Sequence, residues 1–161
     1  MNRKRIALLT GLTLLAGAVV NTTNPLRNAV KNDAEAAQIK TNLKPNSKYP
    51  DIAKKLDLTS MEQYSSVNLF MNVTLKDFYV KESSIDNYGQ SHLLLAPLKT
   101  SDQYFLVVTK SAKTIKKNDM ITVQGFMNGK TRIDNAQIAA GLNQKYLNKK
   151  VVSLIADNLS L

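Results

Sequence analysis

Apolar and polar side chains alternate most regularly within residues 68–81. Every second residue from Leu69 to Leu75 is apolar, which predicts a β-strand with one buried face. Beyond this stretch the apolar pattern moves by one position, to Phe78 and Val80, and one extra residue near Asp77 would account for the shift. We therefore expect a long first strand with a β-bulge, a geometry that helps a small barrel to close.

Four later segments have strand patterns with turn signals between them. We expect strands at residues 91–98, 103–109, 120–127 and 130–139. Pro97 should end the first of these, because proline cannot donate to a central ladder. Gly125 lies where a side chain would obstruct strand curvature, and Asn128 with Gly129 predicts a type I′ hairpin between the last two strands.

Shorter elements are expected on both sides of this region. Residues 37–66 should form an irregular arm and two short helices, one after Pro50 and one from a capping box at Thr59 and Glu62. The apolar residues of these helices should pack on the sheet or close one barrel end, because short helices are stable only when packed. Residues 140–161 should add a short helix at 141–150 and a further strand or extended tail at 151–156. The barrel region is thus expected at residues 67–139.

Two segments carry a resemblance to a known fold. Residues 117–125, KNDMITVQG, resemble the pattern of a small loop, an aspartate, alternating hydrophobic residues and a glycine that is common in OB-folds. Residues 134–138, DNAQI, look like the closing strand of that fold. The resemblance implies a mainly β (α+β) fold, a small five-stranded OB-like barrel with short flanking helices. Residues 111–118 leave room for one or two turns of the helix usually found between the third and fourth strands, and another small barrel or an open β-sheet fits the same pattern.

The N-terminus has the composition of an export signal. A basic segment at 2–5 precedes fifteen apolar residues at 6–20, which is short for a membrane span and typical of a secretory signal. We expect a signal peptide at 1–36 with cleavage between Ala36 and Ala37. The alternative is an uncleaved anchor. The chain has no cysteine, and in this respect it resembles secreted proteins of Gram-positive bacteria. Small exported staphylococcal proteins of pathogenicity islands look similar in size, export signal and lack of cysteine, which implies a host-directed virulence factor.

The charge of the chain predicts an anionic partner. Lysine and arginine number 22 against 12 acidic residues, a formal net charge of +10, which favours polyanions through long-range attraction. The expected ligand-binding set in the basic loop and hairpin is Lys110, Lys113, Lys116, Lys117, Lys130 and Arg132, and the expected stacking faces are Tyr79, Tyr88 and Tyr104. A solvated basic loop is the alternative interpretation. Sequence-specific reading of nucleic acid is not expected, because Arg132 is the single arginine of the barrel region.

The sequence offers few groups for catalysis. His92 is the single histidine, so neither a zinc site nor a histidine-based catalytic group is expected. No Ser-x-x-Lys or phosphate-cradling motif is present, and we expect no catalytic residue, metal or cofactor. Glu82, Asp86 and Asn87 could attract calcium, but their spacing favours a turn that binds its own backbone.

These observations favour a secreted or extracellular, non-enzymatic binding module that engages an anionic polymer or an extracellular protein through its loops. One alternative is a cell-wall-associated structural protein retained by charge. Another is a hydrolase that uses carboxylates such as Asp77, Asp119 and Asp134. Membrane contact is expected through the signal segment if it stays uncleaved, and the oligomeric state is left open.

Overall fold

The computed structural model describes residues 38–110 and 114–161. All described elements belong to one compact unit. The expected signal peptide with its cleavage site at Ala36 and Ala37 lies outside the described residues, as does Lys113. In chain order the described elements are β1 (Gln38–Ile39), the 3-10 helices η2 (Ile52–Lys54), η3 (Met61–Gln63) and η4 (Ser66–Asn68), β2 (Asn72–Ile85), β3 (Ser91–Ala96), β4 (Tyr104–Thr109), β5 (Met120–Arg132), α1 (Asn135–Ala139), η5 (Gln144–Tyr146) and β6 (Lys150–Ser160).

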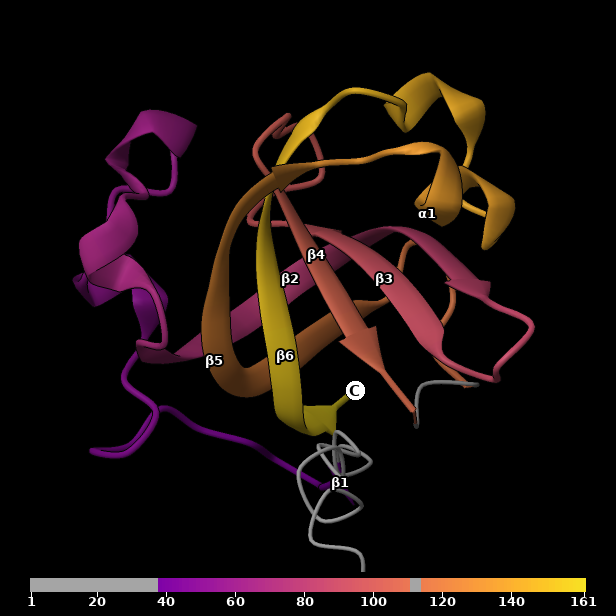
Figure 1. The fold of residues 1–161 in the computed structure, drawn as a ribbon. Coiled ribbons are helices and arrows are strands. Elements are labelled where there is room, and N and C mark those ends of the chain that lie inside the picture. Colours follow the sequence, from indigo (N-terminus) through magenta and orange to yellow (C-terminus); the bar gives the residue numbers. More distant parts are fainter. Residues whose placement is uncertain (1–37, 111–113) are drawn as a thin grey trace, which may run out of the picture. The chain divides into compact units, whose positions relative to one another are not determined.

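Five of the described strands close into a barrel with the neighbour order β2, β3, β4, β6, β5 and back to β2 (Figure 1). Strands β4 and β6 run parallel, and the other barrel pairs are antiparallel. Strand β1 extends the sheet by pairing in parallel with the last residues of β6. The mainly β, OB-like barrel expected from the sequence is therefore confirmed.

The bulge expected near Asp77 is present in β2. The register of β2 against β5 shifts between Leu75 and Phe78, and Asp77 has a φ of 54°. A second shift against β3 lies between Val80 and Glu82. These irregularities bend β2, so that its first half pairs with β5 and its second half pairs with β3.

Gly125 lies where β5 and β6 approach each other closely. An added Cβ would collide with the carbonyl oxygen of Ile155 and would lie 3.0 Å from the Cα of Ala156. The sequence prediction concerned strand curvature, whereas the structure shows that a side chain at Gly125 would collide with the backbone of β6.

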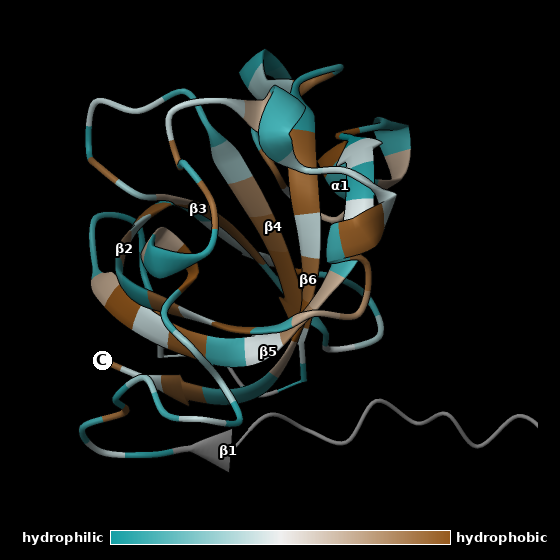
Figure 2. Cartoon of the chain, turned by 90° about the vertical axis from the view of Figure 1, so that its left-hand side faces the viewer, coloured by the Kyte–Doolittle hydropathy of each residue, from teal (hydrophilic) through white to brown (hydrophobic). Residues whose placement is uncertain are grey.

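Apolar side chains form two buried clusters. The barrel interior is filled by side chains from all five barrel strands, among them Val73, Leu95, Phe105, Val123 and Leu154. A second cluster lies between the outer face of the sheet and the connector from β5 to β6, and contains Leu94, Leu106, Ile133, Leu142, Tyr146 and Val151. Figure 2 shows hydrophobic positions concentrated along β4 and β6, with mainly hydrophilic loops around them.

The prediction of a separate fifth strand at 130–139 is wrong. Strand β5 continues through Arg132, and Asn128 with Gly129 forms a bulge inside it, because β6 pairs along both sides of this point. Asp134 then begins α1, its carboxylate accepting the amide of Ala136 at 2.7 Å. The barrel is closed instead by β6, in the segment expected as a strand or tail, and so extends beyond 139 to Ser160. The helix expected at 141–150 is limited to the single turn η5.

The short N-terminal helices pack as expected. Ile52, Met61 and Tyr64 are buried in the same cluster as the barrel interior. Their caps differ from the expected ones, because Asp51 caps η2 and Ser60 rather than Thr59 caps η3. Within the described residues, no helix combines the length and apolarity needed to cross a bilayer.

Candidate functional site

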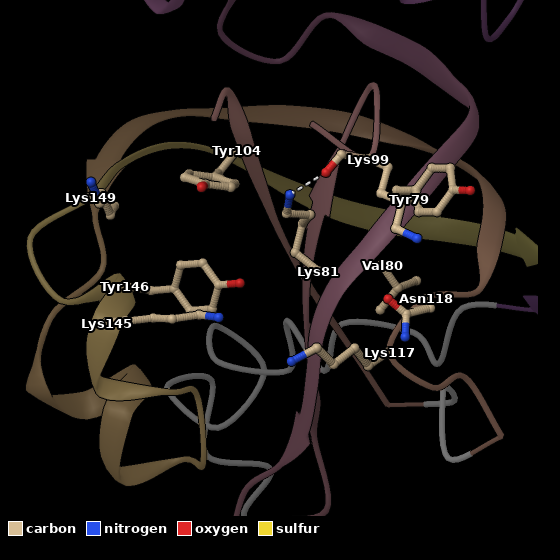
Figure 3. Close-up of a pocket in the computed structure, with 10 residues that line it drawn as sticks. All are labelled: Tyr79, Val80, Lys81, Lys99, Tyr104, Lys117, Asn118, Lys145, Tyr146 and Lys149. Carbon is tan, nitrogen blue, oxygen red and sulfur yellow. Dashed lines mark hydrogen bonds between the residues drawn. The ribbon is translucent and has the colours of Figure 1, made fainter. Parts of the chain in front are cut away.

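A hollow of about 460 Å³ lies beside the second bulge of β2. We call it the lysine-tyrosine hollow, after the residues that line it: Tyr79, Val80, Lys81, Lys99, Tyr104, Lys117, Asn118, Lys145, Tyr146 and Lys149. These residues come from β2, the β3–β4 loop, the start of β4, the turn before β5, and the connector before β6. Distant parts of the sequence therefore bring their positive charges to one concave surface (Figure 3).

Contacts with neighbouring groups hold several of these ammonium groups in place. Lys81 Nζ donates to the carbonyl oxygens of Lys99 at 2.7 Å and Ser101 at 3.4 Å. Lys117 Nζ lies 3.5 Å from a carboxylate oxygen of Glu82. Lys145 Nζ lies 4.9 Å from the centre of the Tyr146 ring, a cation–π distance. A bound anion would thus meet ammonium groups that are already partly ordered.

Two tyrosines form the wall opposite β2. The rings of Tyr104 and Tyr146 meet edge to face with centres 5.6 Å apart. Burial, followed by the neighbouring Tyr146, raises the pKa of Tyr104, and burial, followed by Glu82, raises the pKa of Tyr146. Both hydroxyls therefore stay protonated at neutral pH and can donate hydrogen bonds. Figure 3 shows the Tyr146 hydroxyl directed toward the middle of the hollow.

The local sequence fixes the loops that carry these residues. The amide of Asn118 donates to the carbonyl of Val80 at 2.8 Å, and Asn118 has a φ of 75°, a conformation that asparagine tolerates. The connector before β6 is held in the same way. Asn148 has a φ of 65°, and its amide donates to the carbonyl of Ile133 at 2.8 Å. These asparagines set the positions from which Lys117, Lys145 and Lys149 reach the hollow.

The connector also covers the barrel face that OB-folds commonly use. In such barrels the outer face of the second and third strands binds oligonucleotides or oligosaccharides. Here the outward side chains Leu94 of β3 and Leu106 of β4 are 0% and 3% exposed, because Leu142 and Tyr146 pack over them. The lysine-tyrosine hollow lies at the border of this covered face, where Tyr146 belongs to both.

The structure brings together some of the residues expected from the sequence. Tyr79, Tyr104 and Lys117 line the hollow, whereas Lys110, Lys116 and Tyr88 are not among its described lining residues. Tyr88 is 92% exposed in the turn between β2 and β3. The remaining predicted cations, Lys130 and Arg132, line a different hollow of about 250 Å³ together with Thr131 and Lys150.

Sequence reasoning missed seven of the ten lining residues. Those not predicted as site residues are Val80, Lys81, Lys99, Asn118, Lys145, Tyr146 and Lys149. Lys81 follows the segment in which the apolar pattern shifts by one position, and this shift places it at the edge of the bulge. The shift was the one local sign that Lys81 could belong to a site. Lys145 and Lys149 lie in a connector whose return to β4 depends on the strand order, and no local pattern reveals that return.

The acidic residues considered for catalysis serve local structure. Asp77 lies in the β2 bulge, Asp119 accepts the amide of Lys116 at 2.7 Å, and Asp134 caps α1. Asp86 accepts the amides of Tyr88 and Gln90 and lies 3.0 Å from Nε2 of His92, so the expected self-binding turn is confirmed. His92 itself is buried, at 8% exposure. Among the described residues, no three of the usual metal-ligating side chains gather in one place.

Comparison with known proteins adds little to this geometry. No family model matches the chain, and no curated protein matches it either. Among solved structures, aspartyl-tRNA synthetase from Entamoeba histolytica is similar, with 11% sequence identity and a TM-score of 0.40. The alignment covers 99% of this chain and 28% of the synthetase, so the chain spans less than a third of that protein's length.

Proposed function

We propose that this protein is a non-enzymatic binding module that acts outside the cell and holds an extended anionic polymer in the lysine-tyrosine hollow. The observation that carries the proposal is the convergence of lysines from several separate segments on one open, concave surface of about 460 Å³. Glu82, which lies against Lys117, offsets part of this charge. A surplus of positive charge in a concave site attracts and concentrates anions.

The chemistry of the lining favours a repeating phosphate or sulfate polymer over a single specific sequence of bases. Lysine is a flexible point charge, whereas base reading relies on the planar fork of arginine. Tyr104 and Tyr146 are packed edge to face rather than laid open as stacking faces. Their protonated hydroxyls add hydrogen-bond donors that suit an oxyanion.

Titration with inorganic polyphosphate, followed by calorimetry, tests this proposal. Lys149→Gln should weaken binding by about fivefold, since one close charge pair at the surface contributes about 1 kcal/mol. It should also lower the slope of log affinity against log salt by about one. Uncharged dextran of matched length should not bind.

Lys54→Gln is the matched control, because Lys54 is an exposed lysine in η2 outside the hollow. Equal weakening by Lys54→Gln and Lys149→Gln would sink the proposal. It would instead support retention on a polyanionic wall by overall charge, without a localised site.

The extracellular location rests on the composition of residues 1–36. Fractionation of the source cells with mass spectrometry of the mature N-terminus is the direct test. A chain that begins near Ala37 in the medium supports export, whereas an intact residue 1 in the cell pellet contradicts it.

A further inference from the structure

A second surface, separate from the lysine-tyrosine hollow, presents apolar side chains to solvent. Val67, Leu69 and Phe70 are 84%, 40% and 67% exposed; Val67 lies within η4, and Leu69 and Phe70 lie in the turn from η4 to β2. We call them the apolar tip. The ring of Phe70 lies 6.3 Å from that of Phe126, which extends the apolar surface onto β5. Single exposed apolar residues are ordinary, whereas a contiguous group marks an interaction site.

The backbone of the tip is held in place rather than loose. The amide of Phe70 donates to the carbonyl of Met127 at 2.8 Å, and the amide of Met127 donates to the carbonyl of Met71 at 3.0 Å. Within the turn, the amide of Ser65 donates to the side-chain oxygen of Asn68 at 2.9 Å. The exposed side chains are therefore presented by a backbone tied to β5.

Phe70 adopts this position at a conformational cost. Its φ is 62°, a left-handed conformation that is unusual for a bulky side chain and common for asparagine. Because 67% of Phe70 is exposed, packing within the described chain recovers little of that cost. The contact with Phe126 leaves most of this aromatic side chain in solvent.

The charges around the tip favour one class of partner. No charged residue occurs between Glu62 and Lys76 in the sequence. Lys130 lines the small hollow that contains Leu69, and it also lines the next hollow with Arg132 and Lys150. Glu62 pairs with Lys150 at 3.0 Å and offsets one of these cations. An apolar tip beside a surplus of positive charge has the chemistry of a site for an anionic lipid surface.

We propose that the apolar tip inserts at the surface of an anionic phospholipid bilayer, with Lys130 and Arg132 against the headgroups. This contact differs from the membrane contact expected through residues 1–36. It also shares no lining residue with the lysine-tyrosine hollow, so it is independent of the proposed polymer binding.

Vesicle co-sedimentation tests the proposal. The protein is the chain expected after signal cleavage, which begins at Ala37, contains every described strand and excludes the apolar run at 6–20. It should bind vesicles of phosphatidylglycerol and phosphatidylcholine, bind phosphatidylcholine vesicles far less, and be released by high salt. Phe70→Asn should lower partitioning by about tenfold, the effect of losing one largely inserted aromatic side chain.

Phe70→Asn should fold at least as stably as the wild type, because asparagine suits the left-handed backbone. Thermal unfolding of each variant therefore separates lost binding from lost folding. Leu98→Asn is the matched control, since Leu98 is 65% exposed and lies outside the tip, and its vesicle binding should stay unchanged.

Three results would overturn the proposal. Unchanged vesicle binding by Phe70→Asn would show that the tip does not insert. Equal binding to neutral vesicles would remove the role of Lys130 and Arg132. A concentration-dependent dimer that Phe70→Asn abolishes, without vesicle binding by the wild type, would assign the tip to a second copy of the chain.

Discussion

Replacing Gly125 with alanine should separate the two strands that close the barrel. The new methyl group would collide with the Ile155 carbonyl oxygen and would press on the Cα of Ala156. Both obstacles are backbone atoms of β6, so no side-chain rotation can relieve the collision. Strand β6 cannot move away freely either, because residues 151–155 pair with β4 on its other side.

The structure indicates the size of the effect. Relief requires β5 and β6 to move apart by on the order of 1 Å, which disrupts two or three ladder hydrogen bonds worth about 1 kcal/mol each. Overpacking of the buried residues around the site adds about 1 to 3 kcal/mol. A gain of about 0.5 kcal/mol from the lower entropy of the unfolded chain opposes this. We expect a net loss of about 3 to 5 kcal/mol, a large share of the 5 to 15 kcal/mol typical of a domain.

Urea unfolding followed by circular dichroism measures the loss. Gly89→Ala is the matched control, because Gly89 has a φ of 76° and open space around its missing Cβ. It should cost about 1 to 2 kcal/mol from backbone strain alone. If Gly125→Ala unfolds within about 1 kcal/mol of the wild type, with an unchanged m-value, the reasoning about the β5–β6 contact is refuted.

Further predictions concern the core, a helix cap and acid stability. Phe105 is fully buried with its ring 5.2 Å from Phe78, and Phe105→Ala should cost about 3 to 5 kcal/mol in urea unfolding; a loss below about 1 kcal/mol would contradict the packing. Asp134→Ala removes the cap of α1 and should cost about 1 kcal/mol in the same assay, whereas an unchanged midpoint would show that the cap is dispensable. The hydrogen bond from His92 holds the pKa of Asp86 below its ordinary value. The ionised Asp86 therefore stabilises the fold at pH values above the ordinary aspartate pKa, and this stabilisation is lost as the pH falls through the lowered pKa. Asp86→Asn should therefore flatten the acid side of a stability–pH curve, and an unaltered acid side would argue against this contribution.

The sequence predicted the parts of the fold that local patterns determine. The parity shift at Asp77 indicated a bulge, and the four segments from 68 to 127 are strands with bounds that differ by a few residues. The prediction of a fifth strand failed because an Asn-Gly pair such as Asn128 and Gly129 can form either a hairpin turn or a bulge. Which of the two forms depends on the strand that lies opposite. Here Met127 and Lys130 both pair with β6, so the chain continues as one strand. The capping box at Asp134 and Gln137 was not predicted either, because residues 134–138 were assigned to that fifth strand.

The candidate site was less predictable than the fold. Tyr79 and Tyr104 could be named because they lie in strong strand patterns, and Lys117 because it belongs to a loop of closely spaced lysines. Lys145 and Lys149 reach the hollow through the return of the connector to the outer face of β4, a contact between residues about forty positions apart. The separation of Lys130 and Arg132 from the other predicted cations also follows from strand order, because they face the start of β6 rather than the turn before β5.

The place of β6 in the barrel has a consequence for how the chain reaches its native state. This strand is the last of the described strands to be synthesised, and it pairs with β1, β4 and β5. Until it is added, β4 and β5 each have an unpaired edge, and the interior lacks Val152, Leu154 and Leu159. The pairings it makes span long stretches of sequence, which slows closure. A chain interrupted before residue 150 would expose those edges and aggregate, so the barrel should close only after β6 has been made.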